Sequence, residues 1–182
     1  MPLSKSDAAD ALRTVEDTER FSRSMRGYAA AAPHFFIWGM VWAAGYGLSA
    51  ALPDKRTLVW FGAIAVGALS SAIADARTVG GGKASVWRSV AIAGSVAAIV
   101  GVTMTVLSPL PPRQEIALVP LMAAGFYLLM GIWGGPRFGV AGLLLGAVTV
   151  VGYFFAGDAF GYWMAAAGGG LLFVTGLWLR SV

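Results

Sequence analysis

Six long apolar stretches follow one another along this chain, separated by short polar connections. They cover residues 33–52, 57–76, 85–107, 116–134, 138–156 and 159–179. Only 12 charged side chains occur after residue 32, and each lies between these stretches or near the end of one. A helix that crosses the hydrocarbon core of a bilayer needs about 20 mostly apolar residues. The sequence therefore predicts an all-α, polytopic membrane protein with six transmembrane helices.

The composition favours a membrane protein over a soluble helical domain. Hydrophobic residues make up 58% of the 182 residues and charged residues 12%, whereas ordinary soluble domains have about 45–50% and about 25%. A helix that is apolar on all sides has no polar face to present to water. Six such helices in succession exclude a soluble bundle, and the few remaining residues leave no room for a separate soluble domain.

The connections between the apolar stretches are short and rich in turn-forming residues. They include residues 53–56, 80–83, 108–113, 134–137 and 157–158. Connections of about 2–8 residues place consecutive helices side by side and antiparallel. We therefore expect a transmembrane domain over residues 33–182, built as a compact bundle of three antiparallel hairpins.

Residues 1–32 form a distinct, charged segment that is expected to be an amphipathic helix. Acidic residues dominate up to Glu19, and only Arg20, Arg23 and Arg26 follow. The basic end adjoins the first span, where arginine is attracted to anionic lipid. Apolar residues and one threonine recur at steps of three or four, as in one face of a helix: Ala8, Leu12, Val15, Thr18, Phe21, Met25 and Tyr28. Two interpretations stay open, a helix lying on the membrane or a docking site for a membrane or cytoplasmic protein over residues 4–32.

The distribution of lysine and arginine predicts the orientation of the chain. If the N-terminus is inside, the inside segments hold ten of these residues and the outside loops hold three, at Lys55, Arg56 and Arg113. Basic residues concentrate on the cytoplasmic side of inner-membrane proteins. We expect both termini in the cytoplasm of a cell with a bacterial-type inner membrane. The net charge of +4 then reflects this topology and does not predict nucleic-acid binding.

Ionisable residues inside membrane spans often mark ion or proton pathways, and this chain has few. Asp75, near the inside end of the second stretch and two residues before Arg77, is the nearest case. We expect Asp75 and Arg77 to form an ion pair or to take part in gating. The chain has one histidine and no cysteine, so neither a multi-histidine metal site nor a thiolate site is predicted.

One face of the first span carries four rings at successive steps of four residues. These are His34, Trp38, Trp42 and Tyr46. They face lipid or core, or they line a cavity that binds an apolar or cationic solute through cation–π contact.

Small residues predict where helices approach each other closely, because they let two backbones come near. The glycines expected in such contacts are Gly39, Gly142, Gly146 and Gly170.

A weak internal repeat relates the first and third hairpins. Gly45 is followed by Trp60 and Gly67 in the first, and Gly152 by Trp163 and Gly170 in the third. Tryptophan and the later glycine are 7 residues apart in both. Because both hairpins are expected to start inside, the repeat would be parallel, unlike the inverted repeats of many secondary transporters.

No sequence pattern for a catalytic site or a cofactor is present, so we expect no enzyme activity and no cofactor. The first hypothesis is a small non-catalytic membrane protein. It would be a subunit, stress-response factor or regulator that acts through helix contacts and its N-terminal helix. The alternative is a carrier or channel for a small neutral, lipophilic or cationic solute, and such a protein would be an oligomer, because the spans offer few polar residues for a pore within one chain.

Overall fold

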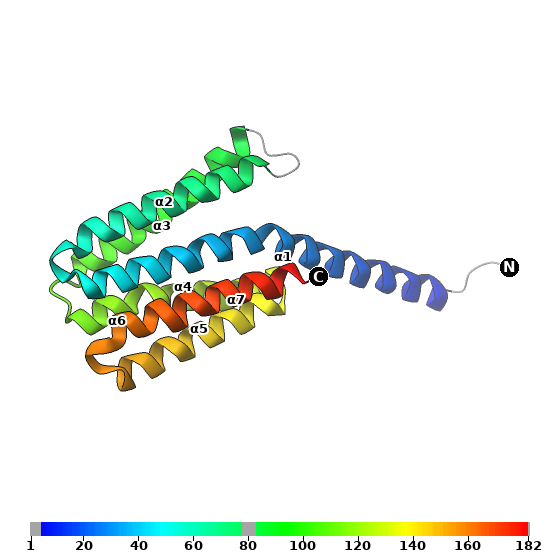
Figure 1. Ribbon diagram of the computed structural model, residues 1–182. Coiled ribbons are helices and arrows are strands. Elements are labelled where there is room, and N and C mark those ends of the chain that lie inside the picture. Colours follow the sequence, from blue (N-terminus) through cyan, green and yellow to red (C-terminus); the bar gives the residue numbers. More distant parts are fainter. Residues whose placement is uncertain (1–4, 78–82, 182) are drawn as a thin grey trace.

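The computed structural model describes residues 5–77 and 83–181, and helices account for almost all of them (Figure 1). None of these described residues forms a strand, in agreement with the predicted all-α class. The long helices are α1 (Lys5–Ala51), α2 (Arg56–Arg77), α3 (Lys83–Val106), α4 (Pro112–Gly134) and α5 (Pro136–Phe155). The short 3₁₀ helix η1 (Pro53–Lys55) joins α1 to α2. The last apolar stretch is divided into four segments, which are η2 (Gly157–Ala159), α6 (Phe160–Trp163), the π-helical segment η3 (Met164–Gly168) and α7 (Gly169–Arg180).

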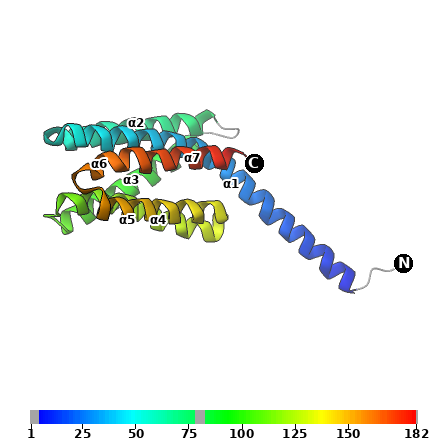
Figure 2. The ribbon, with the colours of Figure 1, turned by 60° about the horizontal axis from the view of Figure 1, so that its bottom comes forward.

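The central helix is α1, against which α2 packs on one side and η3 and α7 pack on another. The α4 and α5 helices form a tight pair, which Figure 2 shows as a layer beside α1 and α7. The α3 helix packs mainly against α2. The outward faces of α2 and α3 expose large apolar side chains, among them Leu58, Phe61, Val66, Ile99 and Val102. Such faces suit contact with lipid rather than water.

The first helix runs without interruption through the predicted junction between residues 32 and 33. Pro33 lies inside α1, where a missing N–H and the proline ring favour a bend. The first half of α1 leaves the bundle at an angle and projects beyond it (Figure 2). We call residues 5–27 the arm, the end of the bundle from which it projects the inner end, and the opposite end the outer end.

Four helical segments are long and apolar enough to cross a membrane, namely Pro53–Arg77, Pro112–Gly134, Pro136–Phe155 and Gly157–Arg180. Val90–Val106 is a shorter apolar helix. The expected spans 33–52 and 85–107 are not among the four, so six crossings stay a prediction. In the first of these stretches, His34 and the Trp and Tyr residues lower the mean hydropathy. The chain is therefore a helical protein whose composition indicates a membrane location.

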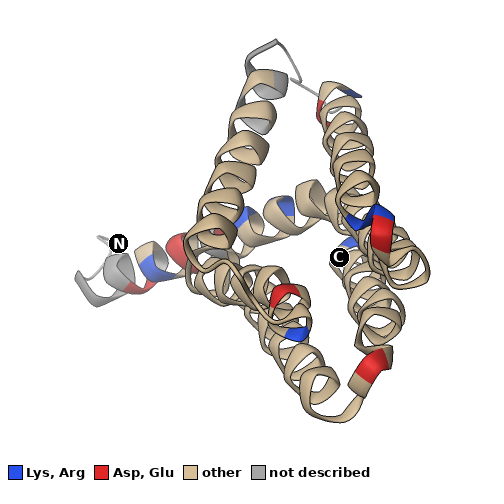
Figure 3. Cartoon of the chain, turned by 90° about the vertical axis from the view of Figure 1, so that its left-hand side faces the viewer, with Lys and Arg blue, Asp and Glu red and all other residues tan. Residues whose placement is uncertain are grey.

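Charged residues gather on the arm and near helix ends, while most of the helical surface carries none (Figure 3). At the outer end, the Arg56 guanidinium donates to the Glu115 carboxylate at 2.6 Å and joins the start of α2 to α4. Arg113 is paired with Asp158 across 3.2 Å. The charges that interrupt the apolar stretches thus tie helix ends together.

Candidate functional site

The ring-bearing face of α1 is turned toward neighbouring helices. Trp42 and Tyr46 are buried, and the Tyr46 ring packs edge-on against Trp60 of α2 with 4.8 Å between ring centroids. The Tyr46 hydroxyl donates to the carbonyl oxygen of Ile116 in α4 at 3.3 Å. Trp38 lies against Gly67 of α2. These rings fill the space between α1 and its neighbours.

His34, the fourth ring on this face, forms a polar contact with α2. Its Nε2 lies 2.9 Å from Oδ1 of Asp75, and the two side chains are 31% and 16% exposed. The sequence suggested both residues separately, Asp75 with Arg77 and His34 with the aromatic face. Residues two apart on a helix do not share a face, so Asp75 reaches α1 while Arg77 lies exposed at the end of α2.

A second cluster holds α1 where the arm leaves the bundle. Tyr28 is buried, and its hydroxyl accepts a hydrogen bond from the backbone N–H of Arg137 at 3.3 Å. The Arg137 guanidinium lies 5.4 Å from the centre of the Tyr28 ring and 5.1 Å from that of Trp178. It also donates to the Trp178 carbonyl oxygen at 2.6 Å. We call Tyr28, Arg137 and Trp178 the collar.

The collar depends on the turn between α4 and α5. Gly135 has φ +118°, a conformation that favours glycine, and a Cβ at this position would collide with the Tyr28 hydroxyl. Phe138 packs on the other side of Tyr28, with ring centroids 5.2 Å apart. Sequence reasoning assigned Arg137 to topology alone and missed this contact. The available signal was the Gly-Gly-Pro-Arg turn, which lets the chain approach α1 closely.

The four glycines expected in helix contacts have different surroundings. A Cβ on Gly39 would lie 2.9 Å from the Gly169 carbonyl oxygen of α7, and one on Gly142 would lie 2.7 Å from the Ala124 carbonyl oxygen of α4. At Gly146 the nearest atom would be Ala124 Cβ at 3.7 Å, which is an ordinary contact. Gly170 was expected to pack closely, but a Cβ there would face open space. Its neighbour Gly169 makes the close contact with α1 instead.

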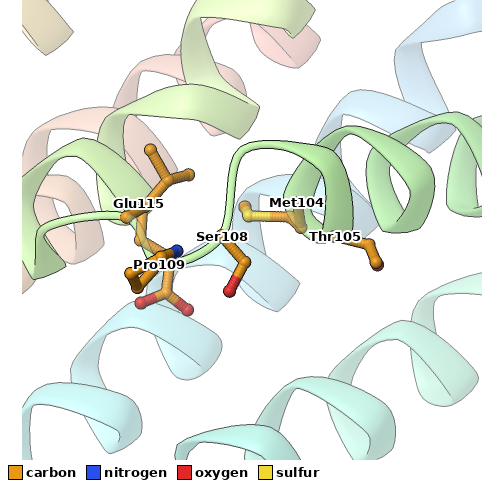
Figure 4. Close-up of a pocket in the computed structure, with 6 residues that line it drawn as sticks. Met104, Thr105, Ser108, Pro109 and Glu115 are labelled. Carbon is orange, nitrogen blue, oxygen red and sulfur yellow. The ribbon is translucent and has the colours of Figure 1, made fainter.

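A surface pocket lies at the outer end, between the loop that joins α3 to α4 and the start of α4. It has a volume of about 450 Å³ and is open to the surface. Glu115 and the loop between α3 and α4 contribute to its wall, as Figure 4 shows. The residues that line it are Met104, Thr105, Ser108, Pro109, Leu110 and Glu115.

Within the described part of the chain, no three His, Asp or Glu side chains gather closely enough to hold a metal ion. Comparisons with known protein families, with curated proteins and with solved structures give no match for this chain. Arguments about function therefore rest on the inner end of the bundle, where α1 contributes His34 to the contact with Asp75 and Tyr28 to the collar.

Proposed function

We propose that this protein is a non-catalytic membrane adaptor, which holds the arm at the cytoplasmic face of the membrane for a protein partner. The observation that carries the proposal is the continuity of α1 from the bundle into the arm. A helix transmits its direction along its length, so the arm is not a loosely tethered tail. The collar fixes this direction at Tyr28, where three side chains from α1, α5 and α7 meet.

The charges of the arm favour a protein partner over the membrane surface. Residues 5–19 contain five acidic and two basic residues, whereas residues 20–26 contain three arginines and no acid. Arginines near the inner end of the bundle are attracted to anionic lipid. The acidic tip is repelled by the same lipid and is held away from it. An acidic helix with exposed Leu12 and Val15 suits a partner with a basic, partly apolar groove.

The membrane topology belongs to the same proposal. We infer six crossings, with α1 from about residue 33 and α3 adding to the four apolar segments. Both termini then lie in the cytoplasm of a cell with a bacterial-type inner membrane, as the distribution of lysine and arginine favours. Reporter fusions at residue 1 and after Val182 should both report cytoplasm, and a fusion within residues 109–113 should report the opposite side. A terminus found outside would contradict the adaptor, because the arm would face the wrong compartment.

The adaptor is favoured over a carrier or channel because the rings that suggested a solute site pack against other helices. Trp42 and Tyr46 are buried among α1, α2 and α4. The pocket at the outer end is open to the surface and lies at the far end of the bundle from His34. A carrier would instead predict ligand-dependent quenching of tryptophan fluorescence that is lost in Trp42→Ala.

Photo-crosslinking in cells tests the adaptor proposal. A photoreactive residue in place of Leu12 or Val15, on one face of the arm, should give a crosslink to a protein. The control is Thr14, which is also exposed but lies on another face and bonds to the Asp10 carbonyl oxygen. Replacing Glu16, Asp17 and Glu19 by glutamine should weaken the protein crosslink, because the acidic tip is lost. Crosslinks to lipid alone, or equal crosslinks from all three positions, would refute the docking face.

A further inference from the structure

The contact between α1 and α2 changes in character along its length. At the outer end the Trp60 ring lies against Gly45 and Tyr46. In the middle, Val41 and Trp38 lie against Gly67. Toward the inner end the two helices diverge (Figure 1).

At this divergence a polar face replaces the apolar one. Gly67, Ser71 and Asp75 follow each other at steps of four on α2, so they share the face that packs on α1. Asp75 reaches His34, and the Ser71 hydroxyl is buried without a hydrogen-bond partner. A buried hydroxyl without a partner is costly unless water can satisfy it. The inner end of the α1–α2 contact is thus its polar end.

We propose that His34 and Asp75 form a proton-binding site that holds the α2–α3 hairpin against α1. A carboxylate only accepts hydrogen bonds, so Nε2–H of His34 donates to Asp75 and Nδ1 is left as the acceptor. A proton from water then binds Nδ1 and turns a neutral hydrogen bond into an imidazolium–carboxylate pair. Charge-assisted bonds of this kind are roughly twice as strong as neutral ones. Proton binding therefore tightens the contact, and proton loss loosens it.

Other charged groups lie on the elements around this contact. Asp75 is the carboxylate that His34 contacts, and Arg77 lies on another face at the end of α2. Arg180 ends α7 on the other side of α1, and Arg137 is engaged by Tyr28 and Trp178. The side chains of Lys83 and Arg88 on α3 lie outside the described residues. The proposal for His34 and Asp75 is independent of the proposal that the arm binds a protein partner.

The single histidine makes the site directly measurable. In full-length protein labelled with ¹⁵N-histidine and placed in lipid nanodiscs, every imidazole signal comes from His34. We expect the Nε2 signal to show a hydrogen bond to a carboxylate in the parent and a weaker hydrogen bond in Asp75→Asn, because bonds to an ionised acceptor are stronger than neutral ones. The control Asp158→Asn, which removes a carboxylate at the outer end, should leave the Nε2 signal unchanged. An identical Nε2 signal in the parent and in Asp75→Asn would overturn the proposal.

A distance measurement tests whether the proton holds the hairpin. The chain has no cysteine, so spin labels can be attached at Ala30→Cys on α1 and Ala76→Cys on α2, both exposed positions. The distance between the labels should lengthen as the pH rises from 5 to 8. In His34→Gln, whose amide donates a hydrogen bond but binds no proton in this range, the distance should not depend on pH. A parent distance that is the same at pH 5 and pH 8 would overturn the proposal.

Discussion

The helix pairs that were expected to form the first and third hairpins share one contact and then pack differently. In the first, α1 and α2 bring the Trp60 ring against Gly45, and in the third, α5 and α6 bring the Trp163 ring against Gly152. Seven residues further on, Gly67 faces Val41 and Trp38 of its own hairpin partner, whereas Gly170 faces open space. The sequence repeat therefore describes the contact near each turn and not the packing along the whole length of the helices.

The difference arises because α7 leaves α5 and packs along α1. The face of α7 that meets α1 carries Gly169, Leu172, Thr175, Gly176 and Leu179, all of them buried. Gly39 and Gly169 let the two backbones come close, and a Cβ on either would lie 2.9 Å from backbone atoms of the other helix. The α7 helix thus packs on α1, where the two backbones can come closest, and not along α5, which precedes it in the chain.

The largest effect is expected from Gly39→Leu, which places a side chain between two backbones. Neither backbone can yield locally, so we expect a loss of about 3 kcal/mol, the upper part of the range for overfilled cores. Thermal unfolding in detergent, followed by tryptophan fluorescence, measures it. Gly170→Leu is the matched control and should stay near the parent. If the two variants were equally stable, the proposed packing of α7 on α1 would be wrong.

A smaller loss is expected from Gly67→Leu, the equivalent of Gly170 in the repeat. Its neighbours are Val41 and Trp38 side chains, the nearest atom 3.0 Å from a Cβ, and side chains shift more readily than backbone. We expect a loss of about 1–2 kcal/mol in the same unfolding measurement. A loss at Gly170 as large as that at Gly67 would restore the equivalence of the two hairpins that the repeat suggests.

The smallest difference in stability is expected between substitutions of the two tryptophans of the repeat, Trp60 and Trp163. The Trp163 indole N–H donates to the Val148 carbonyl oxygen at 2.9 Å, whereas Trp60 makes ring contacts with Gly45 and Tyr46. Trp163→Phe should therefore lose about 1 kcal/mol more than Trp60→Phe, the usual worth of one hydrogen bond. Chemical unfolding of both variants gives the difference, and a reversed order would show that ring contacts outweigh the hydrogen bond.

Helix positions follow closely from the sequence, because length and apolarity decide them locally. The stretches 57–76, 138–156 and 159–179 correspond to α2, α5 and the segment from η2 to α7, with ends that differ by one or two residues. The junction at residue 32 was expected from a change in composition. Helix hydrogen bonds are formed within the helix itself, so a change in polarity does not end α1. The helix also continues past Pro33.

The candidate site could be predicted only as a set of separate residues. The sequence singled out His34 as one of four rings on a helix face and Asp75 as an ionisable residue near a span end. The two residues are 41 positions apart, and nothing in their spacing predicts that they pair. The collar was not predicted, since Tyr28 resembled one more apolar position of an amphipathic helix and Arg137 one more basic loop residue. Gly170 was chosen over Gly169 because a run of three glycines does not show which one faces a neighbour.

The sequence by itself determined the helical class, the positions of most helices and an environment that accepts apolar surfaces, because these depend on residues close together in the chain. The tertiary structure decided which faces meet: α7 with α1, His34 with Asp75, and Arg137 with Tyr28 and Trp178. Each helix is apolar around most of its circumference, so hydrophobicity does not select a packing face. Close backbone approach at small residues and a few polar contacts make that selection, and both depend on the three-dimensional arrangement of all the helices.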